Sequence, residues 1–175
     1  MNLKLLAISL VIFGILSRLI PHAPNITGIG ALMLFGGVYL PKRFAFLPLA
    51  ALFISDYFIG FYGISMIYVY FSFGLAGLIG IWLKDHKSLK NIFGATLITS
   101  IIFYLITNFG VWTDPRSAYS KDLAGLMQSY YYAIPFFRNT ILGDLSYTAL
   151  LFGSYEFIMN ITKRHLSKSI YRLLF

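Results

Sequence analysis

The sequence predicts an all-α fold, a bundle of six membrane-spanning helices in a single domain. Apolar residue types make up 58% of its 175 residues and charged types 11%, whereas soluble domains carry about 25% charged residues. Three stretches contain no Asp, Glu, Lys or Arg: residues 19–41, 57–83 and 91–113. Each of them exceeds the roughly 20 residues that cross a bilayer once. We therefore expect an integral membrane protein with short connections between its helices.

The first three spans are separated by prolines and a basic pair. The first covers about residues 3–20, because Pro21 and Pro24 each disfavour helix at the preceding residue. The second, a short one, covers about 26–40 and ends before Pro-Lys-Arg. The third covers about 44–60 and ends at a Gly-Phe-Tyr-Gly sequence that predicts a tight turn.

The second half of the chain predicts three more spans, at about residues 64–83, 91–112 and 139–161. Before the last of them, apolar residues at helical spacing over 123–135 predict a helix too short to cross, which we expect to lie at the membrane interface. Residues 162–175 place apolar side chains on one helical face and basic ones on the other. This pattern predicts a basic amphipathic tail on an anionic lipid surface or on a partner protein.

Basic residues divide unequally between the two sides of such a bundle. With six spans, the N-terminus, the second and fourth connections and the tail share one side, which holds ten of the fourteen basic residues: Lys4, Lys42, Arg43, Lys84, Lys87, Lys90, Lys163, Arg164, Lys168 and Arg172. The other side holds four: Arg18, Arg116, Lys121 and Arg138. The positive-inside rule then predicts a multi-pass protein of the plasma (inner) membrane with both termini in the cytoplasm.

Several function classes lack their sequence signals. The chain has no cysteine, which excludes disulfides, thiolate nucleophiles and zinc–thiolate sites. It also has no Walker A, Gly-x-Gly-x-x-Gly or His-Glu-x-x-His motif. The net charge of +8 arises from residues at the ends of apolar runs, where it suits lipid headgroups better than nucleic acid. We expect no enzyme activity, no cofactor and no nucleic-acid partner; an intramembrane enzyme using the carboxylates is a weak alternative.

Polar residues gather at the end of the bundle that this topology places outside the cell. A charge at membrane depth costs about 2.5–3.5 kcal/mol, so it normally faces protein, water or an opposite charge. We expect these residues to line an outward-facing cavity or its gate and to bind a small solute: Arg18, His22, Asn25, Asp56, Asn108, Trp112, Arg138, Asn139 and Asp144. The arginines would hold an anionic group, the aspartates would orient donors and Trp112 would stack on a ring.

The same residues allow other interpretations. Asp56 and Asp144 need partners, and an internal Asp–Arg clamp that fastens the first, third and last spans together accounts for them nearly as well. A metal site built from His22 and Asp56 is a third, weaker interpretation, and we expect no metal. The clamp and the cavity are compatible with each other.

A line of small residues marks the fourth span. Ser72, Ala76 and Gly80 follow one another at intervals of four residues, a spacing that lets a second helix approach closely. Packing within this chain is one interpretation. Docking of another membrane subunit is the other.

Five strings of residues carry a family resemblance. They are 18–27 (Arg-Leu-Ile-Pro-His-Ala-Pro-Asn-Ile-Thr), 30–37 (Gly-Ala-Leu through Phe-Gly-Gly), Ser55-Asp56, 107–112 (Thr-Asn-Phe-Gly-Val-Trp) and 135–137 (Pro-Phe-Phe). With them the chain, from Arg18 to about Phe152, resembles an uncharacterised family of prokaryotic six-span membrane proteins. That family is distantly similar to the substrate-binding S components of energy-coupling factor (ECF) vitamin transporters.

The resemblance implies a fold and a function. S components are small six-span proteins that bind a vitamin or other micronutrient from outside and pass it on with a transmembrane coupling subunit and paired ATPases. It implies the same partners here. One feature departs from the pattern: Ala7-Ile8-Ser9-Leu10-Val11 does not supply the Ala-x-x-x-Ala docking pattern of the first span. Because this fold type also serves a cell-shape scaffold, a non-transporting membrane scaffold or assembly protein is the alternative function.

Overall fold

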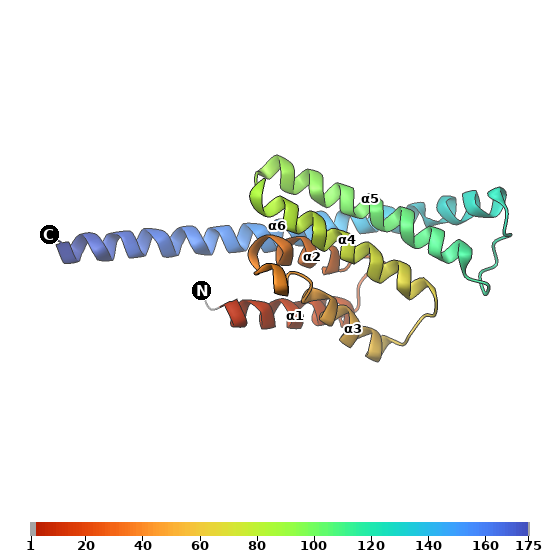
Figure 1. Cartoon of the computed structure of the whole chain (residues 1–175), viewed down its shortest axis with the longest axis horizontal. Coiled ribbons are helices and arrows are strands. Elements are labelled where there is room, and N and C mark those ends of the chain that lie inside the picture. Colours follow the sequence, from red (N-terminus) through yellow and green to blue (C-terminus); the bar gives the residue numbers. More distant parts are fainter. Residues whose placement is uncertain (1–2, 175) are drawn as a thin grey trace.

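The structure, a computed structural model, describes the backbone of residues 3–174 and the side chains of residues 4–164. Over this range it is all-helical and contains no β-strand. The helices are α1 (Leu3–Leu19), α2 (Ile29–Tyr39), the 3₁₀ turn η1 (Lys42–Phe44), α3 (Pro48–Ile59), α4 (Ser65–Asp85), α5 (Leu89–Thr113) and α6 (Leu123–Leu174). Successive α-helices run in alternating directions, so α1 begins and α6 ends at the same end of the molecule (Figure 1).

Helix α2 forms the core of the bundle and packs against all five other α-helices. It has only 11 residues, a length of about 16 Å at 1.5 Å per residue, against about 30 Å for the hydrocarbon core of a bilayer. Every residue from Ile29 to Val38 is buried. An apolar sequence on all sides of a helix, with no polar face, requires this burial on all sides.

The closest helix contact lies between α2 and α4. A Cβ atom on Gly37 would stand 2.5 Å from the backbone carbon of Gly80, and one on Gly80 would stand 2.6 Å from the carbonyl oxygen of Leu34. Ser72 and Ala76 are also buried, with exposed fractions of 2% and 1%. The small-residue line of α4 therefore packs within the chain. It does not form a free docking face, which corrects the second interpretation of Ser72, Ala76 and Gly80.

Helix α6 has 52 residues and runs without a break through Pro135. The expected interfacial helix over 123–135 is therefore the first part of the last helix and not a separate element. The helix begins after Asp122, whose carboxylate accepts the N–H of Gly125 at 2.8 Å and so caps the first turn. Its far end extends beyond the other helices (Figure 1). The side chains from His165 onward, which include most of the predicted amphipathic tail, lie outside the described part of α6.

Within the described residues, two helices, α4 and α5, are long and apolar enough to cross a membrane by length and composition. Helices α1, α2 and α3 have 17, 11 and 12 residues, and α6 interrupts its apolar sequence with Asn139, Asp144 and Glu156. The expected spans at 3–20, 64–83 and 91–112 coincide with α1, α4 and α5, and the one at 139–161 lies within the longer helix α6. Those at 26–40 and 44–60 contain shorter helices than a full crossing needs.

Candidate functional site

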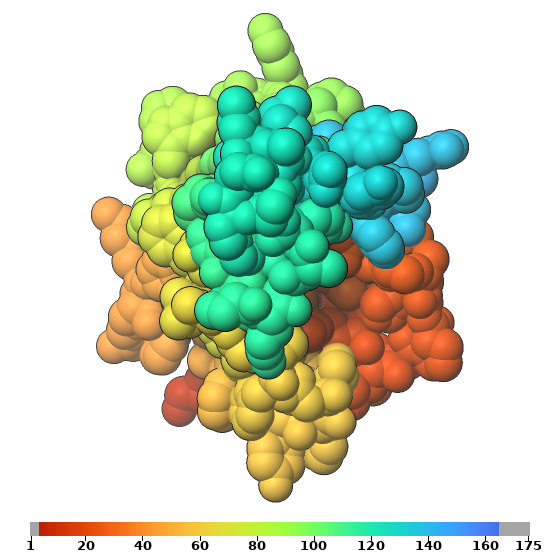
Figure 2. Space-filling view, turned by 90° about the vertical axis from the view of Figure 1, so that its right-hand side faces the viewer, coloured from red at the N-terminus to blue at the C-terminus, as the bar shows by residue number. Residues whose placement is uncertain are grey.

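A cavity of about 460 Å³ lies toward the end of the bundle opposite the start of α1. Seen from that end, the surface is hollowed between the orange-red α1–α2 connection and the teal α5–α6 region (Figure 2). Helices α1 to α6 all contribute lining residues, together with the two connections that follow α1 and α3. The volume falls within the range of about 300–1,000 Å³ that is typical of small-molecule sites.

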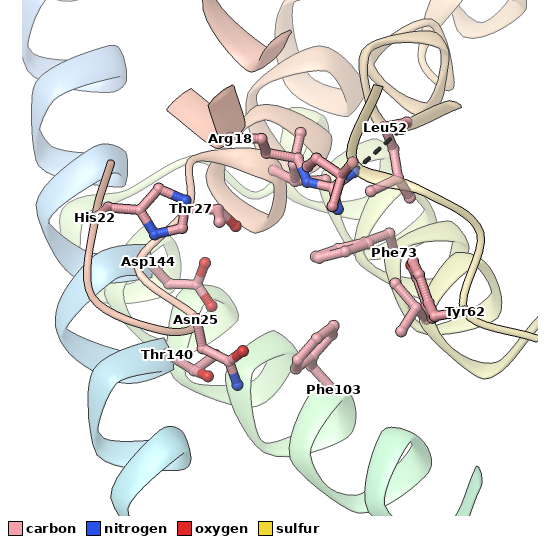
Figure 3. A pocket seen from close by; sticks show the side chains of 13 residues that line it. Arg18, His22, Asn25, Thr27, Leu52, Tyr62, Phe73, Phe103, Thr140 and Asp144 are labelled. Carbon is pink, nitrogen blue, oxygen red and sulfur yellow. Dashed lines mark hydrogen bonds between the residues drawn. The ribbon is translucent and has the colours of Figure 1, made fainter. Parts of the chain in front are cut away.

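The cavity has a polar wall and an aromatic wall (Figure 3). The polar wall comes from the α1–α2 connection and from α6: His22, Asn25, Thr27, Thr140 and Asp144. The aromatic wall comes from the α3–α4 connection, α4 and α5: Tyr62, Phe73 and Phe103. Arg18 lies above both walls and belongs to α1.

Arg18 is bound on its α3 side by three acceptors. Its Nη1 atom lies 2.6 Å from Asp56 Oδ1 and donates hydrogen bonds to Ser55 Oγ at 2.7 Å and to the Leu52 carbonyl at 3.1 Å. Ser55 in turn donates to the carbonyl of Ala51 at 2.7 Å. The ion pair therefore fastens α1 to α3, as the clamp interpretation expects. The clamp does not include the last span, because no ion pair joins α6 to α1 or α3 among the side chains of residues 4–164.

Asp56 is completely buried and receives two further partners. Its Oδ2 atom accepts the hydroxyl of Tyr70 at 2.8 Å and lies 3.5 Å from that of Tyr62. Its side-chain exposure is 0%, against 14% for Arg18. Asp56 lies behind the cavity wall and does not line it, whereas Arg18 and Tyr62 do.

Asp144 has a different environment. Its Oδ2 atom accepts one hydrogen bond, from Ser100 Oγ at 2.7 Å, and its residue exposure is 7%. Its carboxylate contacts the first turn of α2, where a Cβ atom added to Gly30 would stand 2.4 Å from Oδ1. No ion pair of Asp144 occurs among the side chains of residues 4–164.

The α1–α2 connection forms the mouth of the cavity. Asn25 adopts a positive φ of 63°, a conformation that Asn tolerates better than most residues. The Nδ2 of Asn139 donates to the carbonyl of Pro24 at 3.0 Å, and Gly143 leaves room for Ile26, whose Cα would be 3.1 Å from an added Cβ. These contacts fasten the connection to α6.

A smaller cavity of about 240 Å³ adjoins the first and shares with it Asn25, Tyr62, Phe103 and Thr140. Asn108 lines this second cavity. Its own Nδ2 is bound to the carbonyl of Tyr104 at 2.7 Å. The second cavity therefore extends the first along α5.

The α5–α6 connection closes over this end of the bundle. Arg116 binds Asp114 Oδ2 at 2.7 Å and the carbonyl of Tyr62 at 3.1 Å. The side-chain hydrogen bond from Arg116 lowers the pKa of Asp114 to about 2. Trp112 Nε1 donates to the carbonyl of Ser120 at 2.9 Å. Through Arg116, this connection holds the Tyr62 turn in place.

The structure thus brings together most of the expected site residues. Arg18, His22, Asn25 and Asp144 line the main cavity and Asn108 the adjoining one. The other expected residues line neither cavity: Asp56, Trp112, Arg138 and Asn139. Arg138 is exposed, so the expectation that it holds an anionic group has no geometric support. Whether any of the nine binds a solute stays a prediction.

Sequence reasoning missed several lining residues. Thr27, Phe73 and Phe103 are ordinary helix or connection residues with no distinguishing pattern. Ser100, the hydrogen-bond donor of Asp144, had a signal in the sequence. Thr96 and Ser100 on α5, like Asp144 and Thr148 on α6, are four residues apart, the spacing of one helix face. In the structure the two pairs face each other.

The main cavity places polar side chains opposite aromatic ones (Figure 3). No group of three or more His, Asp or Glu side chains is placed to hold a metal ion within the described residues.

The matching family model covers residues 1–168 and is described as a family of unknown function, DUF6580. The chain belongs to this family. No curated protein and no solved structure matches it.

Proposed function

We propose that this DUF6580 protein is an integral membrane solute-binding protein, and that it serves as the substrate-specific subunit of an ECF-type importer of a vitamin or micronutrient. The observation that carries the proposal is the cavity of about 460 Å³ between a polar and an aromatic wall. A few polar groups within a mostly apolar lining are typical of a small-molecule site. The whole bundle would lie in the membrane, with its termini in the cytoplasm.

The outer surface supports a membrane location. Along α1, large apolar side chains are exposed at intervals of three or four residues: Leu5 (62%), Ile8 (56%), Ile12 (52%), Leu16 (48%) and Leu19 (43%). The outer faces of α3, α4 and α5 add Phe58, Phe71 and Ile98, each more than half exposed. A soluble monomer rarely exposes apolar patches beyond a few hundred Å². Lipid is the environment that suits such faces.

The charge distribution supports the orientation. The α2–α3 and α4–α5 connections lie at the end where α1 begins (Figure 1), and they carry Lys42, Arg43 and Lys87. The cavity end carries the four basic residues of the other set. By the positive-inside rule the cavity would open outward, as uptake from outside requires.

The importer role follows from the resemblance to S components and from the absence of a nucleotide-binding motif in the sequence. A subunit without its own ATPase must borrow energy from partners. A transmembrane coupling subunit and paired ATPases would be those partners.

One observation favours the alternative, a membrane scaffold without transport. Arg18 of α1 and the buried Asp56 of α3 are bound to each other, and Arg18 also binds the Leu52 carbonyl of α3, as a structural brace would. A scaffold would use the bundle as a support and leave the cavity empty of solute.

Binding to purified protein in nanodiscs tests the proposal. A panel of vitamins, nucleobases and amines is screened by thermal shift, and hits are measured by equilibrium dialysis. Phe103→Ala removes an aromatic side chain that lines both cavities. Phe93→Ala, the control, removes the same side chain from an exposed site of α5. Loss of binding in Phe103→Ala alone supports the cavity; an unchanged signal in both variants refutes it.

Two further measurements address the membrane and the importer. Since the chain has no cysteine, Ala118→Cys and Lys42→Cys each give one labelling site, and we expect an impermeant reagent to label only Ala118→Cys in intact cells. Mild purification from native membranes should recover a coupling subunit with ATPases. Recovery of shape-determining or assembly proteins instead would favour the scaffold.

A further inference from the structure

The charge of the main cavity differs from what its arginine suggests. Arg18 lines the cavity, but its Nη1 atom is 2.6 Å from Asp56 Oδ1 and also binds Ser55 and Leu52. The positive charge of Arg18 is therefore balanced by Asp56 within the protein. A solute meets this pair as a nearly neutral unit.

Asp144 is the acidic group of the cavity that has no counter-charge among the described side chains. Its carboxylate lines the cavity with an exposure of 7%, and Ser100 is its hydrogen-bond donor, at Oδ2. No Lys, Arg or His lies within ion-pair distance of it among the side chains of residues 4–164. His22, at the mouth, is exposed, and its Nδ1 lies 2.8 Å from the carbonyl of Ala23. A buried carboxylate without a counter-charge favours a cation in the space beside it.

The facing wall suits the same charge. Phe73 and Phe103 lie 4.9 Å apart between ring centroids at an angle of 33°, and both line the cavity with Tyr62. Aromatic faces attract ammonium groups through the ring quadrupole. They also bury an apolar body, so one wall accommodates both parts of an organic cation.

We propose that the main cavity binds an organic monocation, with its ammonium group bound to Asp144 and its apolar body packed against Phe73 and Phe103. This inference rests on the proposed function, because it names the class of solute for that same cavity. It also replaces the earlier expectation of an anionic solute held by arginines. Arg18 is neutralised by Asp56, and Arg138 is exposed and lines neither cavity.

Three indole probes that differ mainly in charge test the inference. Tryptamine is a cation, tryptophol is neutral and indole-3-propionate is an anion at neutral pH. Equilibrium dialysis against protein nanodiscs, corrected with empty nanodiscs for partition into lipid, gives the affinity of each. We expect tryptamine to bind about tenfold more tightly than either of the others. Tighter binding of the anion, equal binding of all three, or no binding of tryptamine overturns the inference.

Substitutions separate the carboxylate from the general charge of the protein. Asp144→Asn should weaken tryptamine binding about tenfold and leave tryptophol binding nearly unchanged. Asp85→Asn is the control, because it also removes one carboxylate, but an exposed one at the end of α4 that lies away from the cavity. Equal losses in both variants would point to a non-specific surface charge and overturn the assignment of Asp144.

A second variant covers the case in which Asp144→Asn fails to fold. Phe103→Leu keeps Asp144 and the apolar volume but removes the aromatic face, and should weaken tryptamine about threefold and tryptophol less. Unchanged tryptamine affinity in this variant contradicts the role of the aromatic wall. A solute that binds through Phe103 but is neutral or anionic would refute the cation inference and leave the proposed binding function in place.

Discussion

Asp56 and Asp144 are both buried carboxylates near the cavity end of the bundle, yet their surroundings differ. Asp56 is enclosed by Arg18, Tyr70 and Tyr62. Asp144 has Ser100 as its hydrogen-bond donor and lines a cavity. The first has its counter-charge inside the protein, whereas the second faces an open space.

The difference separates structure from function within one cluster of polar residues. Removing one member of a closed buried ion pair leaves its partner charged and unsolvated, which is destabilising. Removing a carboxylate that has no partner charge leaves no such group behind. Stability should therefore depend on Asp56, and binding on Asp144.

The largest expected effect comes from breaking the closed pair. Asp56→Asn should lower the free energy of unfolding by about 3–5 kcal/mol, because Arg18 loses its counter-charge. Asp144→Asn should cost less than about 1 kcal/mol, because the amide oxygen still accepts the Ser100 hydrogen bond. Equilibrium unfolding in mixed micelles measures both. Equal losses in the two variants would contradict the comparison.

The double variant Arg18→Met with Asp56→Leu serves as the control for this pair. It removes both charges together, so we expect it to recover most of the stability that Asp56→Asn loses. A double variant as unstable as the single one would mean that the charges act on other groups.

The two tyrosines whose hydroxyls contact Asp56 give the next largest expected effect on stability. Tyr70→Phe removes a hydrogen bond of 2.8 Å to a buried carboxylate and should cost about 1.5–3 kcal/mol. Tyr62→Phe removes a contact of 3.5 Å, which is too long for a strong hydrogen bond, and should cost less than half as much. The same micelle titration ranks them. The reverse order would place the main tyrosine partner of Asp56 in the α3–α4 connection and not on α4.

A glycine substitution tests the contact between the Asp144 carboxylate and α2. Gly30→Ala places a Cβ 2.4 Å from Asp144 Oδ1, so the carboxylate must move away from α2. We expect a loss of about 1–3 kcal/mol in stability and weaker binding of any solute held by Asp144. Gly74→Ala on α4 is the control, since no atom lies within 4 Å of its added Cβ, and it should be neutral or slightly stabilising. Equal effects would remove the argument for contact with Asp144.

The smallest effect concerns Asp114 and Arg116, an ion pair in the α5–α6 connection. The pKa of Asp114 is about 2 in the folded protein, below its usual 3.8. The stabilisation is therefore fully present above pH 3.8 and is lost as the pH falls through about 2. A spin label at Ala118→Cys should become more mobile over this range. In Arg116→Ala the label should be mobile at neutral pH already; a label on Lys42→Cys at the opposite end should not respond to that variant.

Much of the helix pattern was predictable from sequence. The expected spans at 3–20, 64–83 and 91–112 agree closely with α1, α4 and α5. The second span was harder, because an apolar run does not distinguish a helix surrounded by lipid from one surrounded by protein. The helix expected over 123–135 is the first part of α6, which continues through Pro135, since a proline interrupts one hydrogen bond of a helix without ending it when the chain on both sides is held in place.

The location of the candidate site was predictable from sequence, but the pairing of its aspartates with its arginines was less so. Orientation alone placed Arg18, Asn25, Asn108 and Asp144 near one another, but it left two aspartates and two arginines to be matched. The choice of Asp56 for Arg18 depends on the packing of α1 against α3. The turn between Gly60 and Gly63, with φ values of 105° and 75°, brings Tyr62 back over Asp56. Such a three-dimensional return has no signal in hydrophobic periodicity.

Helix α6 connects the cavity to the far end of the molecule, because Asp144 lines the cavity and the helix continues to Leu174. From Asp144 to Leu174 the helix rises about 45 Å along its axis at 1.5 Å per residue, and its last part projects beyond the bundle (Figure 1). A tilt of about 5° around Asp144 would displace the far tip by about 4 Å at that rise. A solute that tilted α6 at Asp144 would therefore move the far tip of this helix, at the end of the molecule where α1 begins (Figure 1).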